Sequence, residues 1–115
     1  TTSERGRWIL GNHQEATSEL ALNGMVEGQL VRATIDRTFI DSEGVRWIID
    51  YKTSRPIPEE EQDEFMNGET ERYRQQLQLY AVLFRQLEEN RSLRTALYFP
   101  MFDGWIEQTG LLPVC

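Results

Sequence analysis

The sequence has very few residues of several kinds, and each scarcity excludes a class of protein. Its only cysteine is Cys115, which rules out an internal disulfide framework and a cysteine-rich zinc site. No apolar run approaches the ~18 residues of a membrane span, and the opening residues lack the basic and then apolar pattern of a secretion signal. We therefore expect a reducing, cytoplasmic compartment and no membrane partner.

Lysine is scarce as well. Lys52 is the only lysine among the 12 basic residues, and the others are arginine. In the simplest interpretation this bias reflects genome composition, and the single exception is chance. The alternative is that position 52 requires a compact, titratable ammonium that a guanidinium cannot replace.

Positive charge is in deficit, with a net charge of −7 and a pI near 4.7. The 115 residues fit one domain with a modest hydrophobic core. The acidity argues against a simple electrostatic nucleic-acid binder, which is usually basic. Part of it is local, in an acidic run over 59–64 that favours a solvated helix start or loop. Carboxylates that bind divalent cations also add to this negative net charge, because the charge of the metal is not counted.

Hydrophobic periodicity and turn residues predict the order of the elements. We expect a short helix over 3–10, strands over 15–22, 29–40 and 45–54, a helix over 69–89, and strands over 94–102 and 104–108. Turns are expected at Asn23-Gly24 and at 41–44, and Pro56 and Pro58 are expected to open a polar loop. This order predicts a mixed α+β (α/β) domain with a small central sheet, mostly antiparallel or mixed.

The loop Ser42-Glu43-Gly44 sets the register of the two strongest strands. A three-residue loop with a left-handed glycine pairs Asp41 with Val45, and counting back sets Asp36 opposite Asp50 and Thr34 opposite Lys52. One face of this hairpin is then apolar and is expected in the core, with Val31, Ala33, Ile35, Phe39, Val45, Trp47, Ile49 and Tyr51. The other face gathers polar side chains, with Thr34, Asp36, Asp50 and Lys52.

Two carboxylates placed directly opposite, with Cβ atoms ~5 Å apart, repel each other. Either one is protonated or a cation lies between Asp36 and Asp50, and Mg²⁺ or Mn²⁺ favours such oxygen ligands. Lys52 on the same face could orient or deprotonate a water, or stabilise charge on a phosphate. This is equipment for metal-assisted phosphodiester hydrolysis. The alternative is a solvated strand edge with a surface ion pair.

The predicted helix adds a third polar element, because Gln76 and Tyr80 are spaced i, i+4 and share one helix face. The alternative assigns Tyr80 to the core stripe that recurs at spacings of three and four, and leaves Gln76 in solvent. That stripe consists of Tyr73, Leu77, Tyr80 and Phe84.

Together, the segments ATIDRTF, GVRWIIDYKTSRP, RYRQQLQLYAVL and ALYFP resemble the nuclease domain of the RecB and AddA type, within the PD-(D/E)XK superfamily. Such domains commonly form the C-terminal end of bacterial UvrD-like helicase-nucleases, as in the exonuclease V beta subunit. The resemblance runs from Gly28 to Pro100, with its blocks in the expected order. It implies a restriction-endonuclease-like core, in which helices flank the sheet.

The resemblance also implies roles for individual residues. Asp36 and Asp50 match the metal-binding aspartates, Lys52 matches the catalytic lysine, and the backbone carbonyl of Tyr51 matches a further metal ligand. Gln76 and Tyr80 match the motif that supports the site and contacts DNA. Neighbouring side chains are expected to contact DNA as well, namely Arg37, Thr53, Arg55, Arg72 and Tyr73.

The sequence departs from the family at one point. The family usually has an upstream helix with a metal-binding histidine, whereas the only histidine here, His13, follows a probable turn and is best interpreted as a loop residue. We therefore expect residues 1–115 to be a single nuclease-like domain cut from a longer chain that supplies this helix.

The expected function is that of a Mg²⁺- or Mn²⁺-dependent DNA exonuclease of a helicase-nuclease in DNA repair and recombination. Its expected partners are DNA, the helicase domains of the parent chain and a partner nuclease subunit. The first alternative is a non-catalytic DNA-binding or scaffold module that keeps the nuclease fold. The second, an unrelated protein-interaction domain, would leave the ordered motif blocks to coincidence.

Overall fold

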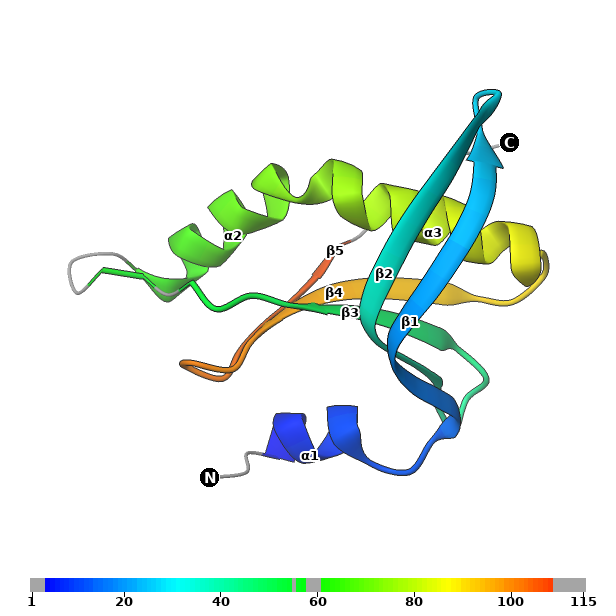
Figure 1. The fold of residues 1–115 in the computed structure, drawn as a ribbon. Coiled ribbons are helices and arrows are strands. Elements are labelled where there is room, and N and C mark those ends of the chain that lie inside the picture. The colour runs from blue at the N-terminus through cyan, green and yellow to red at the C-terminus, as the bar shows by residue number, and fades with distance from the viewer. Residues whose placement is uncertain (1–3, 55, 58–60, 109–115) are drawn as a thin grey trace.

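A mixed five-stranded sheet lies between helices in the computed structural model, which describes residues 4–54, 56–57 and 61–108 (Figure 1). The elements follow in the order α1 (Glu4–Leu10), β1 (Gln14–Val26), β2 (Gln29–Ile40), β3 (Arg46–Tyr51), α2 (Gln62–Arg72), α3 (Arg74–Leu87), β4 (Leu93–Phe99) and β5 (Gly104–Gln108). The strand order is β1-β2-β3-β4-β5, with β3 and β4 parallel and the other neighbours antiparallel. This is the mixed α+β fold with flanking helices that the sequence predicts. No helix in the described part is long and apolar enough to cross a membrane.

Both faces of the sheet are buried. Under α2 and α3, a hydrophobic cluster includes Ile35, Ile48, Leu77 and Leu97, while a second cluster on the α1 side includes Phe39, Trp47 and Ile49. The expectation of one polar face on the hairpin is therefore wrong for much of β3, whose residues 46–50 are all buried. Parallel pairing with β4 makes β3 a central strand, and such strands are apolar on both sides.

The register of β2 and β3 is as predicted. Phe39 pairs with Trp47, and Arg37 pairs with Ile49. The Asp41 N–H donates to the Val45 carbonyl at 2.9 Å, and Gly44 adopts the left-handed φ of 82°. Continuing this register by one residue places Asp36 opposite Asp50.

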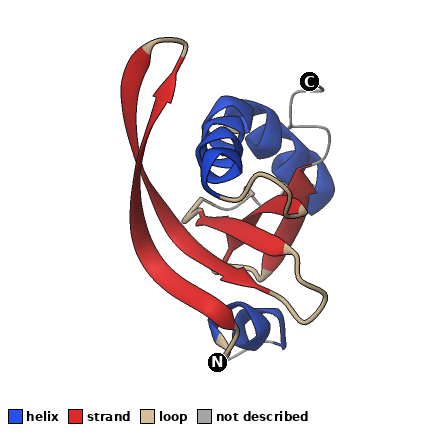
Figure 2. Ribbon diagram, turned by 90° about the vertical axis from the view of Figure 1, so that its right-hand side faces the viewer, coloured by secondary structure: helices blue, strands red, loops and turns tan. Residues whose placement is uncertain are grey.

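The pairing of β2 with β3 does not extend to Thr34, so the expected Thr34–Lys52 neighbours are wrong. Thr34 instead pairs with Ala21 of β1. The β1–β2 hairpin leaves the sheet as a twisted two-stranded ribbon, whose strands cross in Figure 2. Because of this twist, Ile35 packs under α3 although Phe39 of the same strand packs toward α1.

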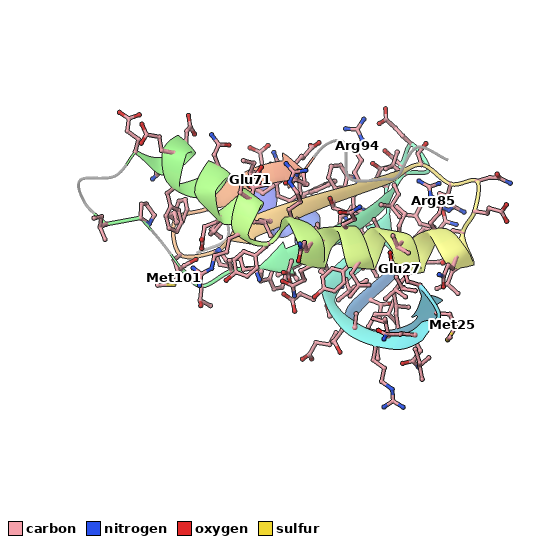
Figure 3. The ribbon with its side chains drawn as sticks, turned by 90° about the horizontal axis from the view of Figure 1, so that it is seen from above. Met25, Glu27, Glu71, Arg85, Arg94 and Met101 are labelled. Atoms are coloured by element: carbon pink, nitrogen blue, oxygen red, sulfur yellow. The ribbon has the colours of Figure 1, made fainter. Side chains whose placement is uncertain are left out.

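The first hairpin turns at a different place from the one predicted. Asn23-Gly24 lies within β1, and the turn is Glu27-Gly28, with φ of 50° and 80° between paired Val26 and Gln29. Gly24 serves packing, because a Cβ there would lie 2.6 Å from atoms of Leu83 and Gln86 on α3. Figure 3 shows Met25 of this hairpin beside the last turns of α3, where its carbonyl accepts a 2.7 Å hydrogen bond from Gln86.

The predicted helix over 69–89 is in fact two helices that meet at Tyr73. There φ is −105° and ψ is 11°, yet the Tyr73 N–H still donates to the Glu69 carbonyl at 3.0 Å. The first helix begins at Gln62, so the acidic run lies partly in its first turn, where carboxylates interact favourably with the helix dipole. Glu59 and Glu60 lie outside the described residues.

Other boundaries differ slightly from the expected ones. β3 ends at Tyr51 instead of residue 54, and β4 ends at Phe99, before Pro100. The short helix and the last edge strand lie where the sequence places them. Pro56 lies in a loop, whereas Pro58 is outside the described residues.

Candidate metal and nuclease site

The carboxyl groups of Asp36 and Asp50 meet where β2 separates from β3. The backbone pairing of β2 with β3 ends at Arg37 and Ile49. Beyond it, the Asp36 carboxylate accepts a hydrogen bond from the Tyr51 N–H at 2.8 Å. Asp50 is only 4% exposed, and its burial together with the nearby carboxyl group of Asp36 raises its pKa. The fold thus forces two acidic groups together at the end of a central strand.

Burial, together with the Asp36 carboxyl group, raises the pKa of Asp50 to about 6, although Lys52 opposes this rise. The oxygen Oδ2 of Asp50 is buried and accepts no hydrogen bond of regular geometry, while it lies 2.9 Å from the Lys52 ammonium. A buried carboxylate is costly unless a positive charge is paired with it, and here the Lys52 ammonium fills that role. The surroundings of this oxygen therefore favour a cation.

Lys52 follows the end of β3, and its N–H donates to the Tyr98 carbonyl at 2.9 Å. Its side chain is 14% exposed and returns to the site. Besides Asp50, its Nζ atom lies 3.4 Å from Gln76 Oε1 and 3.5 Å from the centre of the Tyr73 ring. The only lysine of the chain therefore has its ammonium at the carboxylate pair.

The helix α3 covers the same side of the site. Gln76 donates from Nε2 to the Tyr80 hydroxyl at 2.6 Å. Tyr80 is buried in the core cluster, and burial together with the negative charges of Asp50 and Asp36 raises its pKa. Tyr80 is thus a core residue and a neighbour of the acidic pair at once, while Gln76 connects it to Lys52.

The donor atoms fit a hard divalent cation. Mg²⁺ is typically held by one or two carboxylates, with waters and substrate phosphate in the other positions. Asp36 and Asp50 supply two carboxylates, and the described residues contain no group of three histidine, cysteine or acidic side chains. The two carboxylates therefore suit an oxygen-bound cation that keeps open positions.

The residues expected to contact DNA lie in different environments. Arg37 is buried, and its guanidinium donates to the Ile9 and Gly11 carbonyls and to Ser18, which argues against a contact with DNA. These bonds fasten α1 to the sheet. Thr53 is exposed, and the Arg72 side chain is 71% exposed. The Tyr73 ring faces the Lys52 ammonium, and Arg55 is outside the described residues.

His13 lies in the loop after α1, as expected for a loop histidine. Its ring stacks on Phe39 with centroids 4.0 Å apart, and Nε2 is hydrogen-bonded to the Trp8 carbonyl. Both neighbours belong to the α1 side of the sheet. His13 therefore contributes to packing there.

Glu69 is a neighbour of the site that the sequence did not reveal. It is buried near the end of α2 and accepts a 2.7 Å hydrogen bond from Ser54 Oγ, while Arg72 lies 3.7 Å away. This contact ties the segment after Lys52 to the helix. Glu69 stands in a run of polar residues, so local sequence gave no signal of its burial.

Comparison with known proteins identifies a family match over almost the whole chain. The model described as PD-(D/E)XK nuclease superfamily matches residues 3–105. A solved structure titled "Crystal structure of SSO0001" is similar, with a TM-score of 0.51 and 19% identity over 88% of this chain. The aligned part is 45% of that chain, so this sequence spans less than half of its length, and the likeness concerns the fold alone. No curated protein matches the sequence.

Proposed function

Because the chain belongs to the PD-(D/E)XK nuclease superfamily, we propose that Asp36, Asp50 and Lys52 form a divalent-metal-dependent site that hydrolyses DNA. One observation carries this proposal: the register of β2 and β3 sets Asp36 opposite the buried Asp50 at the end of β3, with the ammonium 2.9 Å from Asp50. A solvated strand edge does not account for it, since Asp50 is buried. Pairs of this kind are typical of sites where a cation and a phosphate meet.

Asp36, Asp50 and the Tyr51 carbonyl would hold Mg²⁺ or Mn²⁺. When bound, the ion supplies positive charge that stabilises the phosphate in the transition state. Lys52 donates hydrogen bonds from Nζ to the phosphate or to the attacking water, and the ammonium also contacts Gln76 on α3. Tyr80, whose hydroxyl accepts a hydrogen bond from Gln76, lies on the buried side of the site.

The wider setting is part of the same proposal. The ordered motif blocks support a DNA exonuclease of the RecB and AddA type, within a cytoplasmic helicase-nuclease of DNA repair and recombination. Residues 1–115 would be its nuclease-like domain, with helicase domains and a partner nuclease subunit as further partners. The exposed Thr53 and Arg72, with Arg55, would contact DNA, while Gln76 and Tyr80 support the site.

Metal binding by the carboxylate pair is the first test of the proposal. Millimolar Mg²⁺ or Mn²⁺ should raise the thermal midpoint of unfolding, because a ligand that binds only the folded state stabilises it by mass action. Asp50→Asn should abolish this shift. Differential scanning calorimetry with and without metal measures it, and Glu64→Gln in the exposed acidic turn of α2 is the matched control. An equal shift in wild type and Asp50→Asn would place the metal elsewhere.

The same variant should behave differently without metal. The folded pKa of Asp50 is raised above its ordinary value of 3.8, so its contribution to stability is complete below that value and is lost as the pH rises through about 6. Asp50→Asn does not titrate, and its amide can donate to Asp36. Between pH 4 and 7, metal-free wild type should therefore lose roughly 1–3 kcal/mol relative to the variant.

A further inference from the structure

The helical segment between residues 62 and 87 is interrupted at Tyr73, where α2 ends and α3 begins. Thr70 Oγ1 donates to the Met66 carbonyl at 2.7 Å in the last turns of α2, and such a bond can bend a helix. The backbone at Tyr73, with φ of −105° and ψ of 11°, lies in the sparsely populated bridge region. Such conformations tend to occur at functional sites.

The junction of α2 and α3 places the aromatic ring of Tyr73 against Lys52. The Nζ atom lies 3.5 Å from the ring centre, which is well within the range of a cation–π contact. Hydrogen bonds on both sides of Tyr73 remain, because its carbonyl accepts from Leu77 N at 3.0 Å. The chain therefore changes direction at this residue while it keeps the helical hydrogen bonds around it.

Three groups contact the Lys52 ammonium, and one of these contacts weakens when a cation binds. Its ammonium contacts Asp50, Gln76 and the Tyr73 ring. Under the proposed function, on which this inference rests, the Asp50 carboxylate is also a ligand of the cation. The positive charge of a bound cation weakens the attraction between Asp50 and the ammonium. Gln76 offers one weak contact at 3.4 Å, so an additional attractive surface is needed to keep the ammonium at the site.

We propose that Tyr73 is a positioning residue for Lys52: at the junction of α2 and α3 it holds an aromatic face under the ammonium. The negative face of the ring attracts the cation from the helix side. It therefore keeps Nζ at the substrate phosphate when Asp50 turns to the metal. The ring, and not the hydroxyl, performs this task.

Two other roles of Tyr73 make different predictions. As a packing residue of the cluster under α3, it would matter for stability alone. As a stacking platform for DNA bases, it would matter for DNA affinity. Only the positioning role predicts that the effect of replacing Tyr73 depends on the presence of Lys52.

A spectroscopic test is available because Lys52 is the only lysine. Lysine labelled with ¹³C at Cε gives one methylene signal, and protons above an aromatic face resonate at lower frequency than in an unfolded peptide. We expect such a shift in the wild-type protein and in Tyr73→Phe, and its loss in Tyr73→Leu. Phe65→Leu is the matched control, because it removes a ring of α2 that packs on Phe99 and Phe102. A wild-type signal at the peptide position overturns the proposal.

The catalytic test uses single-turnover cleavage of linear DNA at saturating Mg²⁺. Tyr73→Leu should slow the chemical step about tenfold, as expected for loss of a desolvated cation–π contact, with little change in DNA affinity. Tyr73→Phe should restore most of the rate. In a Lys52→Ala background, Tyr73→Leu should have no further effect on the rate. The proposal fails if Tyr73→Leu cleaves as fast as Phe65→Leu, or if its effect and that of Lys52→Ala are additive.

The two tests separate this inference from the proposed function. If the wild-type protein does not cleave DNA, the proposed function fails, and the methylene signal still decides whether the ring holds the ammonium. If the protein cleaves DNA and the signal is insensitive to Tyr73→Leu, only the positioning role fails.

Discussion

Replacement of Lys52 by alanine should slow DNA hydrolysis by about 10²–10⁴-fold at saturating metal, a range typical of a lost charge-stabilising or proton-transfer group. DNA affinity should change little, because the ammonium matters most as negative charge builds up on the phosphate. A small loss of stability is expected, since Asp50 loses the ion pair at 2.9 Å. Single-turnover cleavage, beside DNA binding at fixed salt, measures both quantities.

Two further variants test whether the slower hydrolysis comes from loss of the ammonium itself. Lys52→Arg should rescue poorly, because a wide, always-protonated guanidinium cannot take the position of the ammonium between Asp50 and Gln76. Gln76→Ala should be milder than Lys52→Ala, since both carboxylates remain. If Lys52→Ala cleaves as fast as wild type, the lysine has no part in the chemistry.

Replacement of Arg46 by alanine should give the largest loss of stability away from the site, about 2–4 kcal/mol. Arg46 is 4% exposed and joins β3 to α3 and β1. It donates to both carboxylate oxygens of Glu88, at 2.8 and 2.7 Å, and to Glu15 at 2.9 Å. Its loss leaves the half-buried Glu88 with a weaker partner, Arg91, at 3.5 Å. Urea unfolding of the metal-free protein measures the difference.

The pH dependence of this loss follows from Glu88. The hydrogen bond from Arg46 lowers the pKa of Glu88 below its ordinary value of 4.5. The stabilisation is therefore present above pH 4.5 and is lost as the pH falls through the lowered folded value. The difference between wild type and Arg46→Ala should shrink in acid. Arg46→Lys, which keeps the charge without the two-pronged contact, should lose less. A difference that stays constant down to pH 3 would mean that Arg46 acts through packing alone.

Local signals were sufficient to predict the pairing behind the candidate site. The loop 42–44 needs a left-handed residue at its end, and only Gly44 can supply it without strain. That single position fixes the register, and the register brings Asp36 next to Asp50. The spacing of Gln76 and Tyr80 likewise placed both on the helix face toward the site.

Other features depend on contacts between distant parts of the chain. Asn23-Gly24 is a strong turn signal by local rules, but Gly24 is needed where β1 approaches Leu83. The turn then forms at Glu27-Gly28. The helical period gave no sign of the interruption at Tyr73, nor of the contact between its ring and Lys52, which lies far away in the sequence.

Burial of charged residues was equally hidden from the sequence. From the sequence, Arg37 is expected to contact DNA, since it directly follows Asp36. Its side chain instead points to the α1 side and binds the carbonyls of Ile9 and Gly11. Glu69 is buried because Ser54 folds back onto α2. Such pairs form only once the sheet and helices are assembled.

The central claim is that Asp36 and Asp50 together hold a metal that cleaves DNA. Its most direct test is release of nucleotides from end-labelled linear DNA by the longer parent chain proposed above, as wild type and as Asp36→Asn, across a titration of Mg²⁺ and with EDTA. We expect wild-type cleavage that requires metal and is lost in the variant, while covalently closed circular DNA stays intact. DNA binding without cleavage by the wild type would contradict the claim and favour a non-catalytic module, as would equal cleavage by wild type and Asp36→Asn.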